Sequence, residues 1–163
     1  MKLLFISLGC DKNLVDSEEM LGMLAADGHE IVDDEDEAEV IIVNTCCFIG
    51  DAKEESVNTI LEMAEKKKAG TCKVLIVTGC MAQRYKKEIS EEIPEVDAIL
   101  GTTSYGDISK AVKEAQAGRH FEEYKSIDFL PDISGKRMLT TGGHFAYLKI
   151  AEGCDKYCTY CII

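Results

Sequence analysis

The sequence predicts an α/β protein with a doubly wound, open parallel sheet of about five strands, of the flavodoxin or Rossmann type. Short apolar runs alternate with amphipathic helical stretches over residues 1–118, and the segments between them are short. The apolar runs are nearly continuous, which is typical of parallel strands buried on both faces. These observations together favour a sheet covered by helices on both sides.

Each element has its own local evidence. Strands are expected where the chain is apolar and β-branched, at residues 2–8, 29–32, 40–43, 73–78 and 96–100. Helices are expected where apolar residues recur every three or four positions: from Asn13 or Asp16 to Asp27, at 51–68, at 82–92, and from Ser104 or Asp107 to Ala117.

The rest of the chain has a different character. Residues 119–143 are polar, contain Pro131 and several glycines, and lack helical periodicity, so we interpret them as a linker with one or two short strands. Residues 145–150 alternate like a new strand that leads to Gly153 and Cys154. The expected organisation is therefore an α/β domain at 1–118, a linker at 119–143 and the start of a second domain at 144–163.

The amino-acid composition argues against several classes of function. The formal net charge of −12 argues against a nucleic-acid surface, which needs a basic face. No apolar run approaches the roughly 20 residues of a membrane helix, and the apolar start is too short for a signal peptide. We expect a cytoplasmic chain with no membrane partner. Its eight cysteines then indicate metal or redox chemistry rather than disulfides.

Three cysteines follow Gly153 in the pattern C-x3-C-x2-C: Cys154, Cys158 and Cys161, here called the loop cysteines. Thiolates this close can reach one metal centre, but three are too few for a four-ligand structural site. Spacing alone leaves four interpretations: an iron–sulfur cluster with one open iron, a zinc site completed elsewhere, a redox pair of Cys158 and Cys161, or unrelated buried cysteines.

Cys10, Cys46 and Cys80, here called the strand-end cysteines, each follow the carboxyl end of an expected parallel strand. Those ends share one edge of a doubly wound sheet, where ligand sites form. The alternative is three small buried residues that close strands, because free cysteine is among the most buried residue types. The repetition at three strand ends favours a second metal centre.

The loop cysteines, with Tyr160 before the last of them, resemble the C-x3-C-x-aromatic-C loop of radical SAM enzymes. Residues 147–155, Tyr-Leu-Lys-Ile-Ala-Glu-Gly-Cys-Asp, resemble the methylthiotransferase branch of that superfamily, and the strand-end cysteines match its amino-terminal domain. Residues 7–18 resemble the RimO type within that branch. Cys47 departs from the small residue that is common there; the alignment of Asn44-Thr45-Cys46 favours Cys46 as the ligand.

This resemblance implies two 4Fe–4S clusters and S-adenosylmethionine as cofactors. The loop cysteines would bind one cluster, whose fourth iron takes S-adenosylmethionine, with Tyr160 near the adenine. The strand-end cysteines would bind an auxiliary cluster whose open iron carries the sulfur to be transferred. The cofactors carry the radical chemistry, and the product would be a methylthio group on the β-carbon of an aspartate.

The resemblance also implies partners: a basic ribosomal protein of the small subunit as substrate, and a reductant protein such as flavodoxin or ferredoxin. An acidic chain fits a basic protein better than tRNA, although tRNA adenosine methylthiolation stays as the alternative enzyme activity. The non-enzyme alternative is a docking or scaffold module. Residues 144–163 would be the first strand of a truncated radical SAM barrel, so we expect the 163 residues alone to be inactive.

Overall fold

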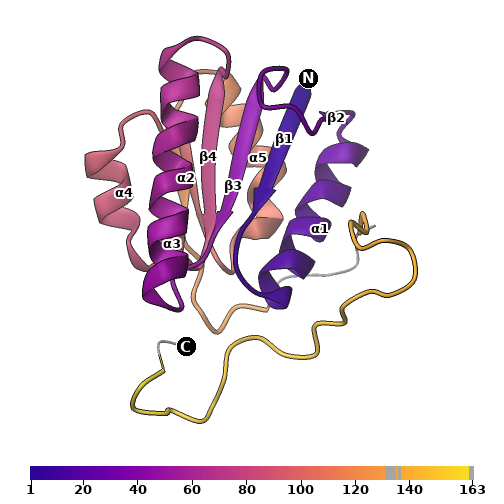
Figure 1. The fold of residues 1–163 in the computed structure, drawn as a ribbon, viewed down its shortest axis with the longest axis vertical. Coiled ribbons are helices and arrows are strands. Elements are labelled where there is room, and N and C mark those ends of the chain that lie inside the picture. Colours follow the sequence, from indigo (N-terminus) through magenta and orange to yellow (C-terminus); the bar gives the residue numbers. More distant parts are fainter. Residues whose placement is uncertain (131–134, 136, 162–163) are drawn as a thin grey trace.

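One parallel sheet of six strands organises the molecule (Figure 1). The structure, a computed structural model, describes residues 1–130, 135 and 137–161. The strands are β1 (Lys2–Ser7), β2 (Glu30–Ile31), β3 (Val40–Thr45), β4 (Val74–Gly79), β5 (Ala98–Gly101) and β6 (Phe121–Glu123). All neighbouring strands pair in parallel, in the order β2-β1-β3-β4-β5-β6. The predicted open parallel α/β fold is confirmed.

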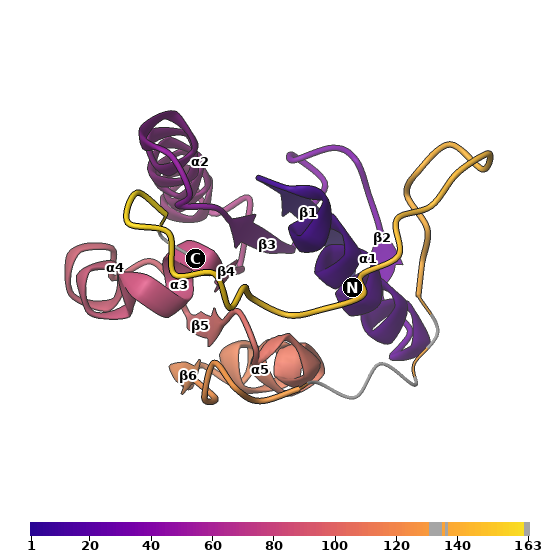
Figure 2. The same cartoon turned by 90° about the horizontal axis from the view of Figure 1, so that it is seen from below.

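Helices cover both faces of this sheet (Figure 2). They are α1 (Asp11–Ala26), α2 (Gly50–Lys68), α3 (Cys80–Arg84), α4 (Lys86–Glu92) and α5 (Ile108–Gln116), with a 3₁₀ turn at Tyr105–Asp107. The residues of α1 and α5 pack in one hydrophobic cluster, and those of α2, α3 and α4 pack in another. The sheet separates the two clusters, as expected for a doubly wound fold.

The alternation of side chains along each strand produces these two clusters. In β3, Val40 and Ile42 face the cluster of α1 and α5, while Ile41 and Val43 face the other side. All six residues of β3 and all six of β4 are buried. Central strands buried on both faces explain why their sequence is continuously apolar instead of alternating.

The strand order places a topological switch point between β1 and β3. The chain runs from β1 outward to β2 on one side, then crosses back to β3 and continues to β6 on the other. In folds with the order 2-1-3-4-5, ligands bind outside the carboxyl ends of the strands at this point. Cys10 follows β1 and Cys46 follows β3, so these two cysteines flank the switch point.

Several local expectations were wrong. Helix α1 begins at Asp11, with Cys10 in the cap position, so Asn13 and Asp16 lie inside the helix instead of capping it. The helix expected at 82–92 is two helices separated at Tyr85, whose backbone leaves the helical region. In contrast, the segment predicted as a linker with one or two short strands does contain a short strand, β6, which pairs with the free edge of β5.

The strand expected at residues 145–150 is absent from the part of the chain that the structure describes. These residues lack a paired neighbour, and Leu148 and Ile150 are 82% and 89% exposed. A strand needs a hydrogen-bonding partner, which a sequence pattern does not reveal. In both views the last described residues, drawn in yellow, lie on the side to which the strands point (Figures 1 and 2). None of the described helices has the length and apolar composition that a membrane crossing requires.

Candidate metal centre

The register of the sheet brings Cys46 and Cys80 to adjacent positions. Thr45 pairs with Gly79 across the β3–β4 ladder, and each is followed directly by one of the two cysteines. Neighbouring strands lie about 4.8 Å apart, so both cysteines leave the sheet at the same edge. Cys46 is buried and Cys80 is half-buried. The predicted placement of these cysteines at the carboxyl ends of parallel strands therefore agrees with the geometry.

Gly9 brings Cys10 against the same edge. Its φ of +96° suits glycine, and a Cβ at this position would lie only 2.6 Å from the Cβ of Cys46 and 2.9 Å from its Sγ. The backbone just before Cys10 is thus in direct contact with Cys46. Cys10 itself is exposed, so this corner of the edge opens to solvent.

The thiols at this edge influence one another electrostatically. Burial, together with the charge of neighbouring thiolates, raises the pKa of the Cys80 thiol to about 11. The neighbours that contribute are, in decreasing order, Cys47, Cys46 and Cys10. Neighbouring thiols make one another's ionisation less favourable. A bound metal centre would offset this cost, because metals bind the thiolate form and their positive charge stabilises it.

A single metal ion and an iron–sulfur cluster place different demands on the spacing of thiolate ligands. Among the residues that the structure describes, no three His, Cys, Asp or Glu side chains are arranged to hold one metal ion. In an iron–sulfur cluster each thiolate binds a different iron, so the ligands stand further apart than around one ion. Three thiols at one edge, with close approach of backbone at Gly9, fit such a group.

Cys47 points to a different environment from Cys46, although both are equally buried, at 7% and 6% exposed. Cys47 belongs to the hydrophobic cluster of α2 and α3, which also contains Met81 and Ala82. Cys46 instead contacts Gly9 across the switch point. Burial raises the pKa of the Cys47 thiol, and Cys46 adds to this effect.

A buried polar network supports the edge from the α1 side. The Asn13 amide donates hydrogen bonds to the backbone oxygens of Leu8, at 2.8 Å, and Thr45, at 2.9 Å. The Asn44 amide donates to Asn13 O, at 3.0 Å, and to Ser17 Oγ, at 2.9 Å. These bonds tie the ends of β1 and β3 to the first turns of α1. Sequence reasoning missed this role; the polar residues at positions 13 and 17, one helical turn apart, were the available signal.

The loop cysteines occupy a different setting. Cys154 and Cys158 are exposed, Cys161 is half-buried, and the Cys161 amide donates to Cys158 O at 3.0 Å. Tyr160 is 90% exposed. Residues 154–161 contain no helix or strand, so a local turn brings the second and third loop cysteines together. The structure therefore joins two of the three loop cysteines through a turn and leaves all three in a loop without helix or strand.

Comparison with known families gives a match over residues 2–101, to the family described as "Uncharacterized protein family UPF0004". The matched segment runs from β1 through β5 and contains all three strand-end cysteines. The chain belongs to this family. The UPF0004 match ends before the loop cysteines.

The relatives of this UPF0004 member include proteins named "Ribosomal protein uS12 methylthiotransferase RimO". The one from Lachnoclostridium phytofermentans is 63% identical over 163 residues, which is 100% of this chain and 37% of that protein. Those from Clostridioides difficile (51% over 163 residues) and Solibacter usitatus (52% over 164 residues) match 100% of this chain and 37% and 34% of their own lengths. The chain thus spans little more than a third of these relatives, and the predicted resemblance to the RimO type is confirmed.

Ser56 of α2 holds the backbone of Cys46 in this chain. Its hydroxyl accepts a hydrogen bond from Cys46 N, at 3.0 Å, and donates one to Cys46 O, at 2.8 Å. Ser56 is fully buried, so nothing else replaces these bonds when it is removed. We expect Ser56→Ala to lower the free energy of unfolding by about 2 kcal/mol, measured by urea denaturation.

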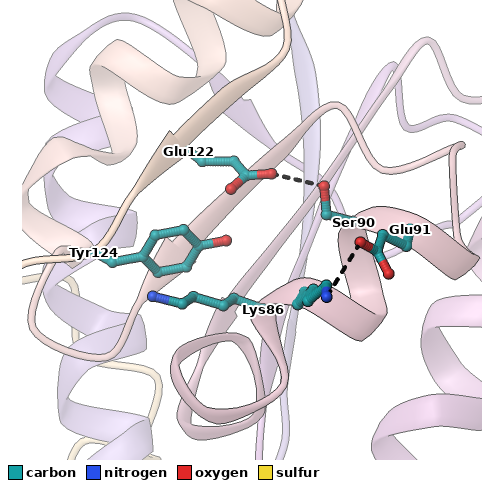
Figure 3. Close-up of a pocket in the computed structure, with 6 residues that line it drawn as sticks. Lys86, Ser90, Glu91, Glu122 and Tyr124 are labelled. Carbon is teal, nitrogen blue, oxygen red and sulfur yellow. Dashed lines mark hydrogen bonds and ion pairs between the residues drawn. The ribbon is translucent and has the colours of Figure 1, made fainter.

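Ser90→Ala is the matched control for this prediction. Ser90 Oγ donates to Glu122 Oε1 at 2.8 Å, but this bond lies at the surface (Figure 3). Its loss should change stability by no more than about 0.5 kcal/mol. Equal losses for the two variants would contradict the special role of Ser56.

A pocket of about 450 Å³ lies away from the cysteines, between α4 and the end of β6 (Figure 3). Its lining is formed by Lys86, Lys87, Ser90, Glu91, Glu122 and Tyr124. Lys87 and Glu91 form an ion pair there at 3.8 Å and partly neutralise each other. The ammonium of Lys86 lies 4.7 Å from the centre of the Tyr124 ring. This open, mixed surface does not contribute to the cysteine edge.

Proposed function

We propose that the chain is the amino-terminal part of a radical SAM methylthiotransferase of the RimO type. The proposed reaction adds a methylthio group to the β-carbon of an aspartate in ribosomal protein uS12. The observation that carries this proposal is the convergence of three cysteine thiols at one sheet edge, in a chain that also contains the radical SAM-like loop. Relatives up to 63% identical are named as ribosomal protein uS12 methylthiotransferases, which supports transfer of a methylthio group to that protein.

The proposed metal ligands are the six cysteines of the two groups. The strand-end cysteines would hold an auxiliary 4Fe–4S cluster, and the loop cysteines would hold a second one that also binds S-adenosylmethionine, with Tyr160 near its adenine. When bound, these groups supply the radical chemistry and the transferred sulfur. The protein contributes the close approach of Gly9, the buried setting of Cys46 and the polar network that ties β1 and β3 to α1.

Charge supports a protein substrate over tRNA. The net charge of −12 attracts a basic ribosomal protein and repels phosphates. A reductant such as flavodoxin or ferredoxin would supply the electrons that radical generation consumes. Both partners belong to the whole protein, of which this chain corresponds to the first third in its relatives.

The test is mass spectrometry of uS12 from a bacterial strain that lacks the full-length protein. We expect the uS12 peptide to lose the mass of its methylthio group, and complementation with the wild-type gene to restore it. Complementation with Cys80→Ala should fail, because it removes one proposed cluster ligand. Cys72→Ala is the matched control: this cysteine is more buried than Cys80, but it lies before the amino end of β4, opposite the proposed centre. Normal uS12 in the deletion strain, with a methylthio group lost from tRNA instead, would contradict the proposal.

A further inference from the structure

Helix α1 carries two acidic side chains that are buried. The side chain of Asp16 is 9% exposed and that of Glu18 is 0% exposed. Burial of a carboxylate is costly unless cationic or hydrogen-bonding partners compensate for the lost water. For both residues, these partners come from a distant part of the chain, residues 137–153.

Glu18 is surrounded by donors from the start of that segment. The Arg137 guanidinium pairs with the Glu18 carboxylate, with Arg137 Nε 2.7 Å from Oε2. Thr140 donates from its backbone N–H, at 2.6 Å, and from its hydroxyl, at 2.9 Å. The backbone N–H of Met138 donates to Glu18 O at 2.9 Å. Burial alone would raise the pKa of Glu18, but the bonds from Thr140 and Arg137 outweigh it and lower the pKa.

Asp16 is held by the end of the same segment. Lys149 pairs with both Asp16 and Glu152, and its side chain is only 7% exposed. Its ammonium also lies 5.3 Å from the centre of the buried Tyr105 ring. One residue before the first loop cysteine, Gly153 O accepts a hydrogen bond from Lys12 Nζ at 3.2 Å.

We propose that Asp16 and Glu18, with Lys149 and Arg137, form a latch that holds residues 137–153 against α1 and thereby positions the loop cysteines relative to the strand-end cysteines. This inference rests on the proposed function, because it gives a reason for the two cysteine groups to be held together. The latch residues are positioning residues, since none of them is a proposed ligand.

The geometry of α1 explains why the latch can do this. Cys10 immediately precedes the helix, and Glu18 lies eight residues further, about 12 Å along the helix axis. The helix is therefore a short rigid connection between one strand-end cysteine and the segment that leads to the loop cysteines. The loop accordingly lies below the carboxyl edge of the sheet (Figures 1 and 2).

Burial distinguishes this latch from ordinary surface ion pairs. Arg119 and Glu114, for example, pair while 62% and 30% exposed, and such pairs contribute little because water competes for both charges. Lys149 and Arg137 replace water around carboxylates that are otherwise enclosed, so their removal has a larger effect. Both lie outside the sheet and its helices, so they can be substituted without disturbing the core.

The first test is hydrogen exchange on the 163-residue chain with Arg137→Met. We expect the backbone amides of Met138 and Thr140, which both donate to Glu18, to exchange at least about tenfold faster, because Arg137 no longer anchors the segment to α1. Amides of β3 should not change, which shows that the domain remains folded. Arg119→Met is the matched control, since it breaks an exposed ion pair that does not involve α1 or the segment.

The second test is cross-linking of Cys10 to Cys154 by a long bifunctional maleimide, mapped by peptide mass spectrometry. Both thiols are exposed, and the Lys12–Gly153 hydrogen bond lies between them. We expect Lys149→Met to reduce the Cys10–Cys154 product several-fold and Lys149→Arg to restore it. Because burial already raises the pKa of Asp16 to about 7, against the opposing effect of Lys149, Asp16 can become neutral when Lys149 is lost. Helix α1 should therefore stay folded in this variant.

Neither test requires a cluster, so both judge the latch independently of the proposed function. Unchanged exchange in Arg137→Met and unchanged cross-linking in Lys149→Met would overturn the latch. In the full-length protein, Lys149→Met should also lower the amount of methylthiolated uS12 formed per 5′-deoxyadenosine released. If the segment is released but this ratio stays at the wild-type value, the positioning role is wrong while the proposed function stands.

Discussion

Cys46→Ala is expected to abolish iron binding at the sheet edge, whereas Cys47→Ala is expected to retain it. Both thiols are equally buried, so burial does not separate them. Their surroundings do: Cys46 contacts Gly9 beside Cys10, while Cys47 packs into the hydrophobic cluster of α2 and α3. Cys46 lies beside the backbone that leads into Cys10, so we expect Cys46 and not Cys47 to be the ligand.

The measurement is iron and acid-labile sulfide per chain after anaerobic reconstitution. The loop cysteines should first be replaced by alanine in all samples, so that only the sheet edge can bind iron. In that background the parent chain and Cys47→Ala should bind close to one cluster, and Cys46→Ala should bind little iron. Retention of iron by Cys46→Ala together with its loss in Cys47→Ala would move the ligand assignment to Cys47. Failure of the parent chain to bind any iron would contradict the whole site.

Gly79→Ala should be the most destabilising glycine substitution at this edge. Gly79 has φ +93° and ψ −161°, a region that is almost confined to glycine and costs an L-residue about 1–3 kcal/mol. A Cβ here would also overlap Asn44 Oδ1 and lie 2.5 Å from Thr45 O. Thr45 O belongs to the backbone of β3, which cannot shift without breaking its ladder with β4. We therefore expect a loss of about 3 kcal/mol in the free energy of unfolding.

Gly70→Ala gives the cost of a positive φ without a steric clash. Gly70 has a similar φ of +86°, but nothing lies within 4 Å of the position that a Cβ would take. Only backbone strain applies there, so the expected loss is about 1 kcal/mol. Urea denaturation of both variants gives the comparison. Equal losses would show that Asn44 and Thr45 can yield, and that the edge is less tightly packed than the structure indicates.

Most of the fold could be predicted from local sequence patterns. The four strands β1, β3, β4 and β5 coincide with apolar runs because strands buried on both faces must be continuously apolar. The placement of Cys10, Cys46 and Cys80 at strand ends follows from the same runs. Their convergence follows from parallel pairing, because the carboxyl ends of parallel strands share one edge.

Other features depended on partners that a local pattern does not contain. Residues Phe121–Glu123 became a strand because β5 had a free edge, while residues 145–150 have no neighbour to pair with despite their alternating pattern. Helix α1 began earlier than expected, at Asp11, which places Asn13 inside the first turn, where its amide donates to Leu8 O and Thr45 O.

The sequence by itself determined the α/β class, the position of each central strand and the two groups of cysteines, because these follow from hydrophobic period and residue spacing. Only the tertiary structure decided the strand order, the separate environments of Cys46 and Cys47, and the pairing of Glu18 with Arg137 across 119 residues. Such contacts join side chains whose positions in sequence carry no information about each other. They arise when the folded sheet and α1 enclose a carboxylate that requires a cation.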